Sequence, residues 1–229
     1  MRDVVTGFYI NVLERLIASG DISVSDSILV VCGGPLDAKV LSAVGFTDVT
    51  VTNLDDGMAN HRQDVENLTY ENGQFDVVVV HAGLHHCYSP HRALLEMYRV
   101  ARKCALAFEA RDSLLMRIAV RLGFTQDYEF DSIENGRGGV ADTGTPNYIY
   151  RWTEREIIKT IASFSTPTHP DTRFFYEMRI PIQRLAKSSG WALRAIAHTI
   201  EPFSRLLSLL APKQCNEFAF AVFKGRCLR

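Results

Sequence analysis

Four consecutive valines, Val77–Val80, form the centre of the segment that most constrains how this chain folds. A run of β-branched residues of this kind predicts a buried strand. The run ends at His81, a polar turn with His85 and His86 follows, and Pro90 suits the first position of a helix, where its missing N–H is not needed. A strand that ends in a polar turn and leads into a helix is the unit from which open α/β sheets build ligand sites.

Strand and helix patterns alternate from residue 28 to residue 122. This alternation predicts an α/β fold with a mostly parallel sheet and right-handed crossovers. The segment Glu217–Phe223 alternates with period two and predicts an antiparallel last strand. Strands are expected at 27–32, 48–53, 77–81, 104–109, 173–180 and 217–223, and helices at 4–18, 37–44, 90–102, 113–122 and 153–162, with helix or loop at 57–66.

The length of 229 residues, with 47% apolar and 22% charged residues, predicts one globular domain over 1–229. Within it we expect an N-terminal helix in 1–25 and a polar, glycine-containing lid or substrate loop at 125–152. A helical insertion is expected at 182–212, where arginine and lysine mix with leucine and isoleucine. Three interpretations of this insertion stay open: a cap over the active site, a homodimer surface, or an amphipathic segment in peripheral contact with anionic lipid.

Charge is distributed unevenly along the chain. Residues 1–80 contain 12 Asp and Glu against 4 Lys and Arg, whereas residues 179–213 contain 6 Lys and Arg against one Glu. The acidic first third argues against nucleic acid as a partner. The five cysteines form no C-x-x-C pair, the N-terminus lacks a signal-peptide pattern, and no apolar run approaches the ~20 residues of a membrane span, so we expect a cytoplasmic protein.

The segment FDVVVVHAGLHHCYSPHRALLEMYRV, residues 75–100, closely resembles the fourth-strand motif of class I S-adenosyl-L-methionine (SAM) methyltransferases, of the methyltransferase-11-like, small-molecule type. Over about residues 26–109, the chain also has, in the family's order, segments that correspond to its first strand and glycine turn, its second strand and its adenine-binding segment. The resemblance implies a Rossmann-like seven-stranded, mostly parallel sheet with helices on both faces and an antiparallel last strand. It also implies SAM as the cofactor and a small-molecule acceptor.

The resemblance assigns cofactor contacts residue by residue. The glycine turn after the first strand approaches the methionine end of SAM, the end of the second strand faces the ribose, and Asp64 with Val65 faces the adenine. Two positions depart from the family pattern: the first strand lacks the usual acid, for which Asp37 is a substitute if it points back into the turn, and Asn53 replaces the ribose-binding acid, with Asp55 as the nearby carboxylate. The implied contacts are Val31, Cys32, Gly33, Gly34, Asn53, Leu54, Asp55, Asp64, Val65, His81 and Ala82.

For catalysis, the resemblance implies that His85 or His86 is the general base and that Glu109, at the end of the next strand, orients it. Histidine suits this role because its pKa lies near neutral pH. Direct transfer without a metal, to an oxygen of a sugar or another polar metabolite, is the expected reaction. The expected substrate contacts are Arg137, Tyr148, Tyr150 and Arg151.

Three alternatives remain at this point. A nucleotide-binding dehydrogenase would share the fold, although the chain lacks G-x-G-x-x-G. A lapsed methyltransferase that serves as a scaffold would explain the missing acids. A nucleic-acid methyltransferase would need a broad basic surface and a pocket for an extruded base.

Overall fold

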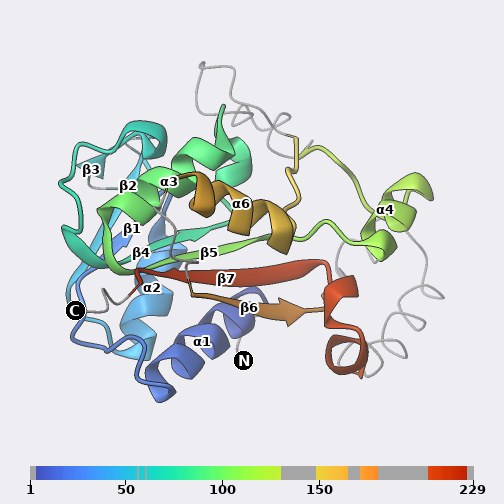
Figure 1. The fold of residues 1–229 in the computed structure, drawn as a ribbon, viewed down its shortest axis with the longest axis horizontal. Helices are drawn as coiled ribbons and strands as arrows, with labels where there is room; N and C mark the ends of the chain where they lie inside the picture. Colours follow the sequence, from blue (N-terminus) through green and yellow to red (C-terminus); the bar gives the residue numbers. More distant parts are fainter. Residues whose placement is uncertain are drawn as a thin grey trace.

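A computed structural model describes residues 4–55, 57–59, 61–129, 148–164, 171–179 and 206–225. At its centre is a seven-stranded sheet of order β3-β2-β1-β4-β5-β7-β6 (Figure 1). Neighbouring strands run parallel except β7, which is antiparallel to both β5 and β6. The strands are β1 Ile28–Val30, β2 Val49–Asn53, β3 His61–Arg62, β4 Phe75–His81, β5 Ala101–Ala110, β6 Thr172–Glu177 and β7 Glu217–Phe223.

The valine run explains why the sheet is buried on both faces. Along β4, Val78 and Val80 belong to one hydrophobic core, whereas Val77 and Val79 belong to the other. All four valines have no exposed surface. Side chains alternate across a strand, so one apolar run supplies both cores.

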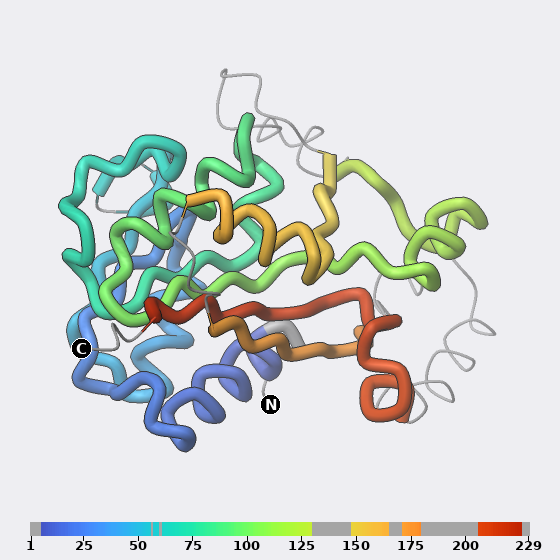
Figure 2. The backbone as a smooth tube through the Cα atoms, in the orientation of Figure 1, coloured from blue at the N-terminus to red at the C-terminus, as the bar shows by residue number. Residues whose placement is uncertain are grey.

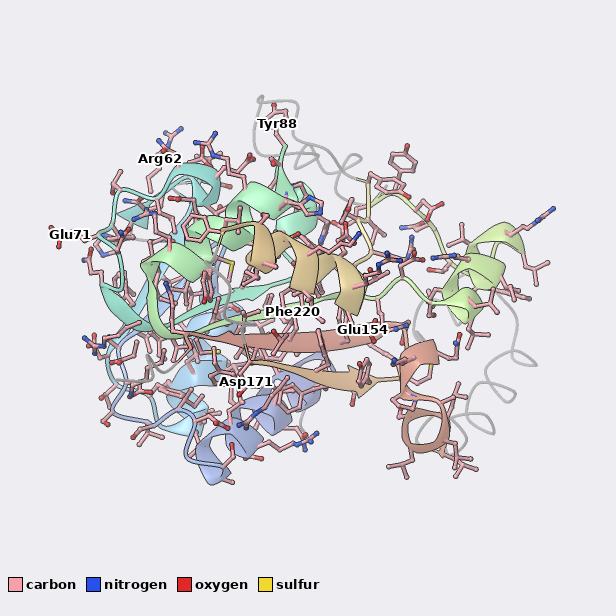
Figure 3. The ribbon with its side chains drawn as sticks, in the orientation of Figure 1. Arg62, Glu71, Tyr88, Glu154, Asp171 and Phe220 are labelled. Atoms are coloured by element: carbon pink, nitrogen blue, oxygen red, sulfur yellow. The ribbon has the colours of Figure 1, made fainter. Side chains whose placement is uncertain are left out.

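Helices cover both faces of the sheet, as the sequence predicted. α3 and α6 pack on the first core, and α1 and α2 pack on the second (Figures 1 and 2). Phe220 of β7 (Figure 3) contributes to the first core. Its ring centroid lies 6.1 Å from that of Trp152. The helices are α1 Val4–Ala18, α2 Pro35–Val44, α3 Pro90–Val100, α4 Leu114–Arg121 and α6 Glu154–Phe164, with the short 3-10 turns η1 Val65–Asn67, η2 Leu84–His86 and η3 Pro212–Gln214.

Local sequence signals place several helix starts. Pro90 stands in the first turn of α3, as predicted. The hydroxyl of Ser113 accepts a hydrogen bond from the Met116 backbone N–H and caps α4. Thr153 similarly accepts from the Glu156 backbone N–H at the start of α6.

Some expected boundaries were wrong. The helix expected to reach residue 102 ends at Val100, and β5 begins at once with Ala101 rather than at residue 104. The segment 57–66, expected to be helix or loop, contains β3, which pairs with β2. The expected insertion at 182–212 lies outside the described residues up to 205, after which 206–210 is helical and η3 follows. Among the described residues, no helix combines the length and apolarity that a membrane span requires.

Candidate functional site

The carboxyl ends of β1 and β4 leave the sheet through two matching strained positions. Cys32, after β1, and Ala82, after β4, both have φ of 51°. A non-glycine residue in this left-handed region costs on the order of 1–3 kcal/mol, and such strain concentrates at functional sites. The two exits are in close contact, because a Cβ added to Gly83 would lie 2.6 Å from Cβ of Cys32.

Hydrogen bonds fix the glycine turn after β1. The Gly33 N–H donates to the Thr52 carbonyl at 2.8 Å. The Gly34 N–H donates to Oδ2 of Asp37 at 2.9 Å, so Asp37 does point back into the turn as predicted. Asp37 is itself buried, which makes this carboxylate part of the turn rather than a surface charge.

Asn53 also belongs to the architecture of this turn. Its Nδ2 donates to the Gly33 carbonyl at 2.8 Å, and its Oδ1 accepts from the Asp55 N–H at 3.0 Å. Asp55 is exposed, and its Oδ1 accepts from the Gly57 N–H at 2.8 Å. The side-chain amide of Asn53 therefore ties the ends of β1 and β2 together, and Asp55 is an accessible carboxylate beside it.

A buried polar pair lies beside the glycine turn. Tyr9 of α1 stacks on His81 with ring centroids 5.1 Å apart and an angle of 4° between the ring planes. The Tyr9 hydroxyl and Oδ1 of Asp37 are both buried, and neither has a well-formed hydrogen bond within the described part of the chain. Burial raises the pKa of Asp37, although the Gly34 N–H and the charge of His81 act in the opposite direction. Burial and then the Asp37 charge raise the pKa of Tyr9.

The segment after β3 is held against the end of β4. Oδ1 of Asp64 accepts from the Glu66 N–H at 2.9 Å and caps η1, which buries Val65. The Glu66 carboxylate accepts from the backbone N–H groups of Tyr88 (2.7 Å) and Ser89 (3.0 Å). Glu66 was not among the predicted site residues, yet it fixes the distance between the expected adenine segment and the histidine turn.

The histidine turn, residues 83–86, lies against the end of β5. The sequence predicted this contact, because the turn follows one strand and Glu109 ends the next. Oε1 of Glu109 accepts from the Gly83 N–H (3.0 Å) and the Leu84 N–H (2.8 Å). Oε2 of the same carboxylate lies 3.2 Å from Nδ1 of His85. Glu109 thus orients the turn and the imidazole together.

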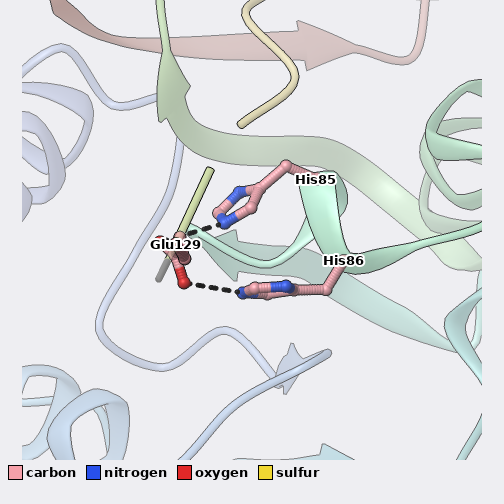
Figure 4. A group of neighbouring side chains, drawn as sticks. All are labelled: His85, His86 and Glu129. Carbon is pink, nitrogen blue, oxygen red and sulfur yellow. Dashed lines mark ion pairs between the residues drawn. The ribbon is translucent and has the colours of Figure 1, made fainter. Parts of the chain in front are cut away.

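Glu129 completes a cluster that the sequence did not predict. Its Oε1 lies 3.4 Å from Nε2 of His85, and its Oε2 lies 3.5 Å from Nε2 of His86 (Figure 4). The His85 side chain is 5% exposed, whereas that of His86 is 29% exposed. Burial would lower the pKa of His85, but the carboxylates of Glu109 and Glu129 outweigh it and raise the pKa to about 10.

A cavity of about 480 Å³ opens beyond the carboxyl end of β5. Tyr148, Tyr150 and Arg151 line it, as the expected substrate contacts would, but Arg137 lies outside the described residues. The complete lining is Asp112, Met116, Arg117, Val120, Asp127, Tyr148, Tyr150, Arg151 and Glu156.

The arginines of this cavity are paired with acids. Nη1 of Arg151 lies 2.5 Å from Oδ1 of Asp127, and Nη2 of Arg117 lies 2.5 Å from Oδ2 of Asp112. The Tyr150 hydroxyl donates to Oε1 of Glu156. The lining therefore mixes polar groups with the apolar Met116 and Val120, and both of its arginines are neutralised by acids within the cavity.

Comparisons with known proteins agree with this architecture. Residues 29–108 match the family described as methyltransferase domain. A putative methyltransferase from Bacillus halodurans C-125 superposes with a TM-score of 0.52 at 13% identity, covering 93% of this chain and 99% of that chain. No curated protein matches the sequence.

Two further solved structures share the fold. Magnesium protoporphyrin IX methyltransferase from Synechocystis PCC 6803, with bound SAH, has a TM-score of 0.53 at 11% identity and covers 95% of this chain and 82% of that chain. A SAM-dependent methyltransferase from Archaeoglobus fulgidus has a TM-score of 0.53 at 14% identity, with 96% and 94% covered. Residues 29–108 thus match the methyltransferase-domain family, and the strand order and these neighbours show that the chain has the fold of class I SAM-dependent methyltransferases.

Proposed function

We propose that this enzyme methylates an oxygen atom of a small, polar, uncharged acceptor such as a sugar. The cavity beyond β5, whose two arginines are both paired with acids, is the observation that carries the proposal. Because Asp127 and Asp112 pair with Arg151 and Arg117, the cavity offers hydrogen-bonding groups without an unbalanced positive charge for a phosphate or carboxylate. A neutral hydroxylated molecule matches such a lining.

The residues around the glycine turn fit SAM. The buried Asp37 carboxylate, whose Oδ1 contacts the Tyr9 hydroxyl but without good hydrogen-bond geometry, suits the α-ammonium group of the methionine end. The exposed Asp55 suits the ribose hydroxyls better than Asn53, which uses one amide N–H on the Gly33 carbonyl and its Oδ1 on the Asp55 N–H. Val65 offers its backbone and Asp64 its second carboxylate oxygen to the adenine. Bound SAM supplies a methyl group activated by the neighbouring sulfonium.

The cavity and the histidine cluster are joined by two short stretches of chain. Asp112 follows Glu109 by three residues, and Asp127 precedes Glu129 by two. The cavity therefore lies within a few residues of chain from the groups proposed to handle the acceptor's proton. Holding acceptor oxygen and methyl carbon in line contributes about 7–11 kcal/mol in well-oriented systems.

Among the predicted catalytic residues, His86 is the one that reaches the acceptor in this proposal. Its side chain is 29% exposed, whereas His85 is buried between Glu109 and Glu129. His86 takes the proton of the acceptor hydroxyl, and Glu129 at 3.5 Å stabilises the resulting imidazolium. His85 and Glu109 hold the turn that positions His86.

The test combines cofactor binding with an acceptor panel. Calorimetry should show saturable SAM binding, and neutral sugars and hydroxylated metabolites should give SAH and a methyl ether by mass spectrometry. His86→Ala should lower kcat by about 100-fold or more, since general base catalysis contributes about 10²–10⁴, with SAM affinity little changed. His61→Ala, an exposed change in β3, is the matched control. Methylation only of phosphorylated acceptors, amines or RNA would overturn the proposal, as would a protein that does not bind SAM.

A further inference from the structure

The side chains of His85, His86 and Glu129 converge on one point at the end of η2 (Figure 4). His85 Nε2, His86 Nε2 and a carboxylate oxygen of Glu129 all lie within 4.8 Å of one another. We propose that these three residues form a binding site for a divalent metal ion, with Zn²⁺ or Co²⁺ as the fitting probes. Two imidazoles and one carboxylate are the donor set of several three-ligand metal sites in enzymes.

The distances favour a shared ion over direct hydrogen bonds. Nε2 of His85 and Nε2 of His86 lie 3.4 and 3.5 Å from the two Glu129 oxygens. N–H···O hydrogen bonds normally span about 2.7–3.2 Å. Ligand atoms about 2.1 Å from a tetrahedral zinc ion are about 3.4 Å apart. The two nitrogen–oxygen spacings are therefore those of ligands around a common ion, and the two nitrogens lie within 4.8 Å of each other.

The burial of His85 adds to this geometry. The residue is 5% exposed, and the contact of its buried Nε2 with Glu129 at 3.4 Å lacks the geometry of a good hydrogen bond. This nitrogen is aimed into the centre of the cluster toward Glu129. A metal ion between the two groups would satisfy this buried nitrogen better than the long contact with the carboxylate does.

Glu109 supports the same conclusion from behind the ring. Its Oε2 lies 3.2 Å from Nδ1 of His85, so a carboxylate holds the nitrogen that does not face the cluster. Metal-binding histidines almost always donate their second ring N–H to a carboxylate, carbonyl or water. Glu109 does not coordinate the ion itself, but it is placed to fix the orientation of the His85 ring.

Three protein ligands leave one coordination position open, as in catalytic zinc sites. With the ion bound, His86 and Glu129 are ligands, so the proton role proposed for His86 applies to the metal-free protein. An acceptor hydroxyl at the open position would instead be acidified by the ion, a consequence that rests on the proposed function, whereas the metal affinity does not. The sequence alone led us to expect transfer without a metal. Glu129 changes that expectation, because it adds the carboxylate that the two adjacent histidines lack.

The experiment measures metal binding to the full-length, chelator-treated protein without SAM or acceptor. Co²⁺ should bind with a 1:1 stoichiometry and give the visible absorption of a tetrahedral or five-coordinate site, and Zn²⁺ should displace it. His86→Ala and Glu129→Gln should each weaken binding at least 10-fold, and Glu109→Gln should weaken it by about 10–100-fold through the orientation of His85.

His91→Ala is the matched control. Nε2 of His91 lies 2.8 Å from Oε1 of Glu156, so this substitution also removes a histidine that has a carboxylate partner. The metal affinity of the variant should equal that of the native protein. Circular dichroism of each variant establishes folding; Glu129→Gln alters a side chain that is 32% exposed and keeps its shape. Absence of saturable binding by the native protein, or equal affinity in folded His86→Ala and Glu129→Gln, would overturn the metal site. Failure of every acceptor to be methylated would bear only on the proposed function.

Discussion

Oε2 of Glu109 lies 3.2 Å from Nδ1 of His85, and Oε1 of the same side chain accepts two backbone N–H groups, from Gly83 and Leu84. One buried carboxylate at the end of β5 therefore organises the turn after β4. This arrangement requires parallel neighbouring strands, since only then do both carboxyl ends lie at the same edge of the sheet.

Replacing Glu109 by glutamine should destabilise the fold as well as the site. Hydrogen bonds to a charged acceptor are about twice as strong as neutral ones, and a weakened buried network of this kind costs about 1–3 kcal/mol. Urea denaturation in the presence of a chelator measures the change in the free energy of unfolding. Glu71→Gln, at an exposed position, is the control. Equal stability of Glu109→Gln and the native protein would contradict this account of the turn.

Asp76, at the start of β4, should make stability depend on acidic pH. Burial alone would raise the pKa of Asp76, but the Arg102 guanidinium, the Ser27 N–H and Lys103 outweigh burial and lower the pKa below its ordinary value of 3.8. The stabilisation is therefore complete above about pH 4 and is lost as the pH falls through the lowered pKa in the folded state.

Asp76→Asn tests this prediction. At pH 7 the variant should be less stable by about 1–3 kcal/mol, because a partly buried hydrogen-bond network loses its charge. The difference between the two proteins should shrink as the pH falls below 4, which denaturation curves at several pH values would show. A difference that stays constant from pH 7 to pH 3 would mean that the Asp76 charge does not contribute.

Much of the fold follows from apolar patterning, and the exceptions have identifiable causes. The valine run specified β4, and its period of two placed residues in both cores. β3 was missed because His61 and Arg62 are both exposed and have no apolar pattern. The boundary between α3 and β5 was misplaced because the two elements join directly at Val100 and Ala101, without a glycine or proline to mark the change.

The candidate site was predictable where strand ends determine it. Glu109 and the histidine turn meet because adjacent parallel strands bring them together. Glu129 was not predictable, since it follows α4 in a polar stretch whose sequence carries no periodicity that would relate it to His85. The role of Asn53 was also not predictable, because the pattern showed its place at the strand end but not that its amide donates to Gly33.

Gly83→Ala should damage both strand exits. The added Cβ would lie 2.6 Å from Cβ of Cys32 and 2.9 Å from Cγ2 of Val80, and neither group is the end of a flexible side chain. Overpacking of this kind costs about 1–3 kcal/mol, and displacement of Cys32 should weaken SAM binding. Gly7→Ala in α1, where an added Cβ meets nothing within 4 Å, should leave both properties intact or raise stability slightly. Thermal denaturation and SAM calorimetry on both variants measure the two properties. Equal stability and equal SAM affinity in Gly83→Ala and Gly7→Ala would refute the close packing of the two strand exits.

Asn53→Asp would restore the acid that class I methyltransferases usually have at the end of β2, yet it should impair this protein. The Nδ2 of Asn53 donates to the Gly33 carbonyl at 2.8 Å, and a carboxylate at the same place would oppose that oxygen without a proton to share. Loss of this bond should cost about 1–3 kcal/mol of stability and loosen the glycine turn, so SAM affinity should fall rather than rise. Asp55→Asn should weaken SAM binding with little effect on stability, because Asp55 is exposed. A gain in SAM affinity in Asn53→Asp would show that the turn tolerates the acid and that Asn53, not Asp55, faces the ribose.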